Sequence, residues 1–178
     1  MPNSTIPPER SSPDSSLDLL REPLRQTEAM KADWLVIVKA HHEMLERAFN
    51  ELIDGGGDPS RRPILYKRLA YLLTAHSVAE ENVIYPALAM FGLQSDSDRL
   101  YLDQAHAKVM NAMLDMADDK LGEAWLERAQ ALRSAVLAHA KDDEEGDLYP
   151  RLVAAIDAST ATKLSVAYRR EFLAVQPT

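Results

Sequence analysis

Apolar residues recur three and four positions apart along most of the chain after residue 24, with polar residues between them. This spacing is typical of α-helices that bury one face. The pattern breaks at residues that end helices, above all in the glycine-rich segment 54–59. We therefore expect helices over about 24–53, 60–86, 96–118 and 123–149, and a last amphipathic segment over about 160–175.

Short links join these helices, and short links place successive helices antiparallel. The pattern predicts an all-α fold, an up-down-up-down antiparallel four-helix bundle with an extra C-terminal helix. Residues 1–24 hold five of the ten prolines and many serines, so we expect a disordered tail there. We expect the bundle over 25–157 and the C-terminal helix over 158–178, packed on the bundle or paired with another chain.

Composition narrows the possible functions. With 178 residues, of which 46% are hydrophobic, the chain is the size of one domain with one core. The absence of cysteine excludes thiolate metal sites, and the net charge of −8 argues against a nucleic-acid partner. The sequence contains neither an apolar run long enough for a membrane span nor a signal-peptide pattern, so we expect a cytoplasmic protein without a membrane partner.

Four of the five histidines are regularly spaced, one on each expected bundle helix: His42, His76, His106 and His139. Each lies on the apolar face that we expect to point inward. At 1.5 Å per residue their distances from the turns place the four rings at similar heights in an antiparallel bundle. One buried imidazole alone is more often a satisfied core residue. Four at one level predict a metal site, because coordination satisfies nitrogens whose burial is otherwise unfavourable.

Carboxylates accompany two of these histidines. Glu80 follows His76 by four residues and therefore lies on the same helical face. After His139, Asp143 has the same spacing, but the shared ending of Tyr85-Pro86 and Tyr149-Pro150 aligns Glu144 with Glu80. A local π-bulge would bring Glu144 inward. We prefer Glu144 and keep Asp143 as the alternative. We expect Glu145 on a solvated face.

These residues resemble the hemerythrin-like proteins, the HHE cation-binding domain family, over about 30–155. The resemblance rests on His42, His76 with Glu80, His106, and His139 with Glu144 or Asp143. It implies a buried non-heme di-iron centre, with terminal imidazoles and two bridging carboxylates. The resemblance is incomplete, because Met110 stands where oxygen carriers have a second histidine on the third helix. We expect an open iron position there, and we place His41 at the rim of the site or at the surface.

The resemblance implies that the chain binds or reduces a small diatomic molecule or peroxide, namely O2, peroxide or NO, at the iron pair. The alternative is a non-catalytic iron or oxygen sensor, or an iron-holding protein that acts through a partner. A third hypothesis is a metal-free interaction bundle. Whether the chain is an enzyme, and whether it forms a homodimer, stays open at this point.

Overall fold

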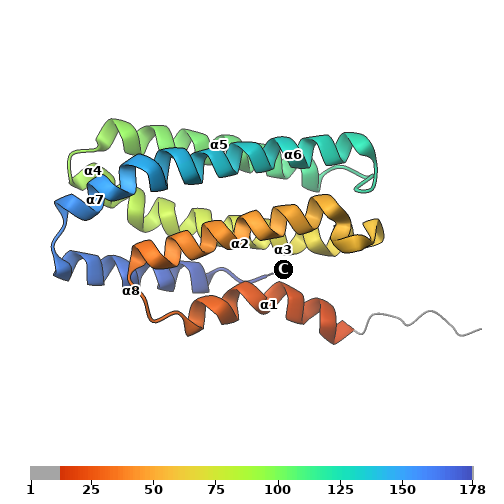
Figure 1. Ribbon diagram of the computed structural model, residues 1–178, viewed down its shortest axis with the longest axis horizontal. Coiled ribbons are helices and arrows are strands. Elements are labelled where there is room, and N and C mark those ends of the chain that lie inside the picture. The colour runs from red at the N-terminus through yellow and green to blue at the C-terminus, as the bar shows by residue number, and fades with distance from the viewer. Residues whose placement is uncertain (1–12, 178) are drawn as a thin grey trace, which may run out of the picture.

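The computed structural model describes residues 13–177, and this part of the chain is helical without a β-strand (Figure 1). Two long helices continue through π-helical segments into short α-helices. The elements are α1 (Pro13–Ala29), α2 (Trp34–Asp54), η1 (Gly55–Gly57), η2 (Pro59–Arg61), α3 (Arg62–Ala79), η3 (Glu80–Ile84), α4 (Tyr85–Met90), α5 (Gln94–Asp115), α6 (Glu123–Ala138), η4 (His139–Leu148), α7 (Tyr149–Ala155) and α8 (Ala158–Ala174).

Local sequence explains where α2 begins and ends. The Asp33 side chain accepts a hydrogen bond from the Val36 amide and so caps the first turn. Gly55 ends the helix in the left-handed conformation, with φ of 66°, and its amide donates to the carbonyls of Glu51 and Leu52. The expected break at residues 54–59 is therefore present, and it turns the chain into α3.

The long helices α2, α3, α5 and α6 lie side by side along the long axis of the molecule (Figure 1). Helix α2 packs against α3 and α6, and α6 packs against α5. Helix α8 covers α2 and α3, and α1 lies against α3 and α8. The core between them is apolar and includes Trp34, Leu45, Phe49, Leu69 and Leu132, each at most 1% exposed. Apolar burial of this kind is the main favourable contribution to folding.

The N-terminal part differs from our expectation. Residues 13–29 form α1, so the expected disordered tail over 1–24 is wrong for residues 13–24, while residues 1–12 lie outside the described part. The helix forms because its inner side buries Leu20 and Thr27 against neighbouring helices. The first bundle helix consequently begins at Trp34, after a short break, and not near residue 24.

The inward face of α5 also differs from our expectation. Residues that we expected inside are exposed: Leu102, His106, Val109, Met113 and Met116. The buried residues of α5 are Ser97, Leu100, Gln104 and Leu114. Helical periodicity identifies residues that share a face, but it does not say which face is inward when the buried one carries serine and glutamine.

No helix among residues 13–177 has both the length and the apolar character that a membrane span requires.

Candidate metal centre

Three histidines and two glutamates meet in the interior, where α2, the end of α3 and η4 face one another. They form two groups that share Glu80: His42, His76 and Glu80, and Glu80, His139 and Glu144. His76 Nε2 lies 3.1 Å from Glu80 Oε2, and His139 Nε2 lies 3.2 Å from Glu144 Oε1. His42 Nε2 lies 3.3 Å from Glu144 Oε2 and 3.6 Å from Glu80 Oε1. Each carboxylate therefore faces two imidazoles.

The π-helical segments position the two glutamates. In η4, the Tyr149 amide donates to the Glu144 carbonyl, five residues back, and in η3 the Tyr85 amide donates to the Glu80 carbonyl. The wider turn of η4 places Glu144, at position i+5, beside His139. A proline follows each tyrosine. Because proline lacks an amide hydrogen and clashes with the carbonyl four residues back, it favours this local change of helical period.

Two buried tyrosines bind the carboxylates crosswise. Tyr85, which follows Glu80 in the chain, donates to Glu144 Oε1 at 2.8 Å. Tyr149, which follows Glu144, donates to Glu80 Oε1 at 2.5 Å. The Gln104 amide from α5 donates to Glu80 Oε2 at 2.9 Å. These hydrogen bonds fix both carboxylates and leave part of their oxygen lone pairs facing the histidines.

The unsatisfied atoms at the centre of this cluster test whether a metal fits. His42 Nε2 and Glu144 Oε2 are buried and have no hydrogen-bond partner, although they lie 3.3 Å apart. The ring nitrogen is thus close to the oxygen without pointing at it. Two ligand atoms about 2.1 Å from one ion lie about 3.0–3.4 Å apart at octahedral or tetrahedral angles. The spacing, the orphaned atoms and the imidazole and carboxylate donors therefore fit a first-row transition metal.

Electrostatics within the cluster favour a positive charge on two histidines. Burial opposes a positive charge on His139, but Glu144 outweighs burial and raises the pKa of His139 to about 9. Burial also opposes charge on His42, yet Glu144, Glu145 and Glu80 hold its pKa well above the ordinary value. The pKa of Glu144 is lowered, because His139 and His42 outweigh its burial. Protons occupy the positions where a cation would neutralise the carboxylates.

His76 behaves differently from these two histidines. Burial lowers its pKa to about 4, although Glu80 lies close to it. Its ring is therefore neutral at neutral pH, and one ring nitrogen keeps a lone pair.

Glu145 orients His42 from outside the centre. Its Oε1 atom lies 2.7 Å from His42 Nδ1, and Lys141 binds the same oxygen at 2.9 Å. Burial raises the pKa of Glu145, but His42 and Lys141 outweigh it and lower this pKa to about 2. Our expectation of a solvated Glu145 is wrong, because the π-helical turn of η4 brings it toward α2. A carboxylate on the far nitrogen of a histidine is a common outer partner of metal ligands.

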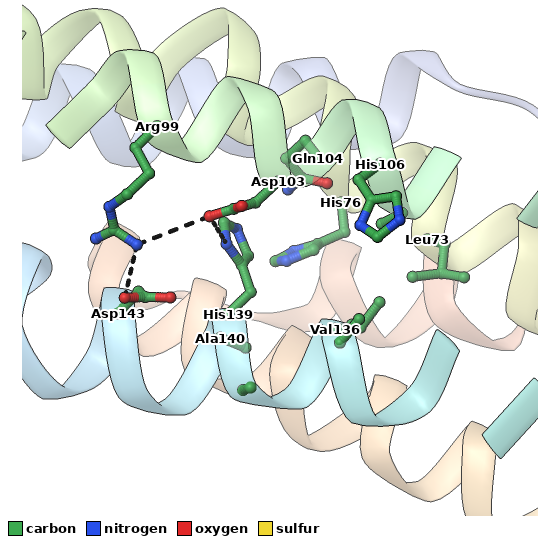
Figure 2. Close-up of a pocket in the computed structure, with 13 residues that line it drawn as sticks. Leu73, His76, Arg99, Asp103, Gln104, His106, Val136, His139, Ala140 and Asp143 are labelled. Atoms are coloured by element: carbon green, nitrogen blue, oxygen red, sulfur yellow. Dashed lines mark hydrogen bonds and ion pairs between the residues drawn. The ribbon is translucent and has the colours of Figure 1, made fainter. Parts of the chain in front are cut away.

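The structure does not bring His106 into this group. His106 is exposed on α5 and lines a cavity of about 310 Å³ together with His76, Gln104 and His139 (Figure 2). Helix α5 instead presents Gln104 to Glu80, because this glutamine lies on its buried face. Sequence reasoning missed Gln104, since an isolated glutamine carries no metal-ligand pattern.

Asp143, the alternative to Glu144, lies at the rim of the same cavity. It binds Arg99 at 2.7 Å, and Figure 2 shows both side chains there, with Asp103 beside them. Asp103, His139 and Asp143 form a third group with metal-ligand atoms. This group is partly exposed, and the Arg99 side chain already pairs with Asp143 and would compete with a metal ion for it.

The expected surface position of His41 is wrong, because its side chain is fully buried. Helix α2 packs against α3, α6 and α8, so two of its neighbouring side chains, His41 and His42, both point inward. Burial, and then His42, lower the pKa of His41 to about 3. His41 contacts the hydroxyls of Thr27 and Tyr168, and Tyr168 also contacts His76.

Comparisons with known proteins identify a family and one relative. The model of the hemerythrin HHE cation binding domain matches residues 35–161, a range that contains all the candidate ligands. A Nostoc sp. protein named DNA nickase is 25% identical over 140 residues, which are 79% of this chain and 38% of that protein. The chain therefore spans less than half the length of this relative. No solved structure matches the chain.

Proposed function

We propose that this chain, which belongs to the hemerythrin HHE cation-binding domain family, is a non-heme di-iron protein that binds or reduces O2, peroxide or NO. The observation that carries the proposal is the convergence of three buried imidazoles on two shared carboxylates, with unsatisfied atoms between them. We also infer that α2, α3, α5 and α6 form the up-down-up-down bundle around this centre. A cytoplasmic location stays a prediction.

The residues of the chain provide a fixed and neutralising site. His42, His76 and His139 would present ring nitrogens, and Glu80 and Glu144 would each face two positions in the centre. Tyr85 and Tyr149 donate hydrogen bonds to the two carboxylates and would hold them in place around a bound metal. When bound, iron would supply the electrons for reduction and a Lewis acid that binds a small ligand.

The cavity beside the site supports a small ligand. It lies between α3, α5 and α6 and reaches His76 and His139 from a polar rim of Arg99, Asp103 and Asp143 (Figure 2). Its volume of about 310 Å³ is at the lower end for a ligand pocket and is ample for a diatomic molecule or peroxide. On this side α5 supplies the Gln104 amide, which donates a hydrogen bond to Glu80.

We do not extend the name of the Nostoc relative to this chain. A surface that binds nucleic acid neutralises phosphates with lysine and arginine, whereas this chain has a net charge of −8. We propose instead that it has no nucleic-acid partner. The second candidate function is an iron or oxygen sensor, which the connection of the site to α1 and α8 favours.

The first experiment measures metal content and the visible spectrum of protein purified without a histidine tag. We expect about two irons per chain after anaerobic loading, and a spectral change when peroxide is added. His76→Ala should lose the metal, and His106→Ala, on the exposed side of α5, should retain it. Persistently low metal in the wild-type protein would contradict the proposal and favour a metal-free interaction bundle.

Turnover separates the enzyme from the sensor. Repeated consumption of peroxide by the loaded protein supports reduction as the function. A single stoichiometric oxidation, together with a change in oligomeric state or in the packing of α1, supports the sensor.

A further inference from the structure

A chain of hydrogen bonds connects His76 to the N-terminal helix. His76 Nδ1 lies 2.9 Å from the Tyr168 hydroxyl, which lies 3.0 Å from His41 Nδ1. His41 Nε2 lies 2.9 Å from the Thr27 hydroxyl, and Thr27 donates to the Pro23 carbonyl at 2.8 Å. The chain thus crosses from α3 through α8 and α2 to α1.

The hydrogen bond to the Pro23 carbonyl determines which group donates in each of the other hydrogen bonds. A carbonyl oxygen can only accept, so the single hydroxyl hydrogen of Thr27 is used there. The Thr27 oxygen must then accept from His41, which places a hydrogen on His41 Nε2. Thr27 and His41 are both fully buried, so water does not offer another partner.

The hydrogen position on His41 in turn determines those on Tyr168 and His76. The His41 ring is buried without a carboxylate beside it, and a neutral ring with hydrogen on Nε2 has a lone pair on Nδ1. Tyr168 therefore donates its only hydrogen to His41 Nδ1. The Tyr168 oxygen must accept from His76 Nδ1, and the lone pair of His76 is left on Nε2, 3.1 Å from Glu80.

We propose that Thr27, His41 and Tyr168 are positioning residues that hold His76 in the Nδ1–H tautomer, with the Nε2 lone pair facing the metal centre. The importance of this tautomer for metal binding rests on the proposed function. The tautomer itself is a property of the metal-free protein.

The packing of His41 and the hydrogen bonds of Glu80 both support this tautomer of His76. The His41 ring packs against Phe172 with a centroid distance of 4.1 Å and an angle of 31° between the ring planes, which restricts its rotation. Glu80, with Oε2 3.1 Å from His76 Nε2, would favour hydrogen on that nitrogen. Its two oxygens already accept from Tyr149 and from Gln104, so its demand for another donor is reduced.

This hydrogen-bond network lies partly outside the domain that the family model describes. The match covers residues 35–161, whereas Thr27 belongs to α1 and Tyr168 to α8. The two helices that cover the bundle thus take part in preparing a metal ligand. His42 is prepared differently, by the carboxylate of Glu145 on its Nδ1 atom.

The test uses nitrogen NMR of isotope-labelled histidine in the full-length metal-free protein, because ring-nitrogen shifts distinguish the two neutral tautomers. We expect Nδ1–H for His76 and Nε2–H for His41. His76 with hydrogen on Nε2 would overturn the proposal, whether or not the protein later binds iron. Normal tautomers in a protein that never loads iron would contradict the proposed function alone.

Variants of Thr27 test the proposal at a residue that does not itself contact His76. Thr27→Val keeps the shape but removes the hydroxyl, so the chain can reverse, and we expect His76 to shift toward Nε2–H. Thr27→Ser should restore the wild-type tautomer. If Thr27→Val folds normally and leaves the His76 spectrum unchanged, the proposal is wrong.

Metal affinity provides the second readout. We expect Tyr168→Phe to weaken anaerobic ferrous-iron binding by about 10- to 100-fold, as is common when an outer partner of a ligand is lost. Tyr71→Phe is the matched control, because Tyr71 is also buried but its hydroxyl faces the Val175 carbonyl. Equal affinities of the two variants would contradict a positioning role for Tyr168.

Discussion

At the level of single residues, each of the two buried glutamates faces a different pair of histidines. Glu80 faces His42 and His76, and Glu144 faces His42 and His139. In the metal-free protein the positively charged imidazoles of His42 and His139 balance the carboxylates, whereas His76 is neutral. A bound cation would replace that balance, so the same residues are suited to both states.

Replacing neighbouring acids separates the metal centre from the rim of the cavity. We expect Glu144→Gln to weaken ferrous-iron binding more than tenfold, because a neutral amide lacks the negative charge that would neutralise a bound cation. Asp143→Asn should keep the metal, since Asp143 binds Arg99 at a half-exposed position. Elemental analysis after anaerobic loading measures both. Loss of metal in Asp143→Asn together with retention in Glu144→Gln would reverse our assignment.

The sequence predicts part of this cluster well for a physical reason. His42, His76 and Glu80 follow a clear helical face, and the repeated Tyr-Pro ending indicates Glu144 over Asp143. His41 and Glu145 could not be placed from periodicity, because α2 is covered on several sides and η4 departs from the α-helical period. Tyr168 has no local signal at all, since its partners come from helices far away in the sequence.

At the level of elements, the π-helical segments orient two side chains that a regular α-helix would direct elsewhere. They turn Glu80 and Glu144 toward the centre and then return each helix to its α-helical course at Tyr85 and Tyr149. Gly146 lies within η4, and a Cβ atom there would be 3.1 Å from the Lys141 carbonyl. The backbone of the wider turn thus leaves little room for a side chain.

The sign of the change in unfolding free energy on Gly146→Ala tests whether the wider turn of η4 has room for a side chain. In an ordinary helix the change stabilises by about 0.5–1 kcal/mol. Here we expect a lower free energy of unfolding, because the methyl group would push against the carbonyl of η4. Denaturant unfolding of the metal-free protein measures it, with Asp147→Ala as the control at the neighbouring exposed position. A gain in stability from Gly146→Ala would show that the turn has room for the methyl group.

The helices as elements were predicted better than their orientations. The glycine-rich break after α2 and the expected helical regions are present, because capping residues and apolar spacing act locally. The inward face of α5 was wrong, since its exposed side carries leucine, valine and methionine and its buried side carries Gln104. Helix α1 was missed because its proline and serine content outweighed the leucines that pack it against α3 and α8.

For the molecule as a whole, metal binding, protonation and stability are linked. A ligand that binds only the folded state stabilises it, by about 2.7 kcal/mol at 100 times its Kd. In the metal-free protein His42 and His139 carry protons that the metal must displace. Apparent metal affinity therefore falls as the pH falls below about 9, the pKa of His139.

The pH dependence of this stabilisation has a definite sign. The pKa of His139 is about 9 in the folded protein and 6.5 ordinarily, so its ion pairs stabilise the metal-free fold fully below pH 6.5 and lose this effect as the pH rises through 9. Metal binding improves over the same range. We expect the difference in Tm between iron-loaded and metal-free protein to widen from pH 6.5 toward pH 9, measured anaerobically at fixed iron concentration.

His106→Ala is the control, because this exposed histidine is outside the two groups and should leave the trend intact. A difference that narrows as the pH rises would mean that iron does not compete with protons at His42 and His139. Calorimetric titrations of iron binding in two buffers with different ionisation enthalpies measure the proton release directly. Release in the wild-type protein and in His106→Ala, but not in Glu144→Gln, would tie it to the buried cluster.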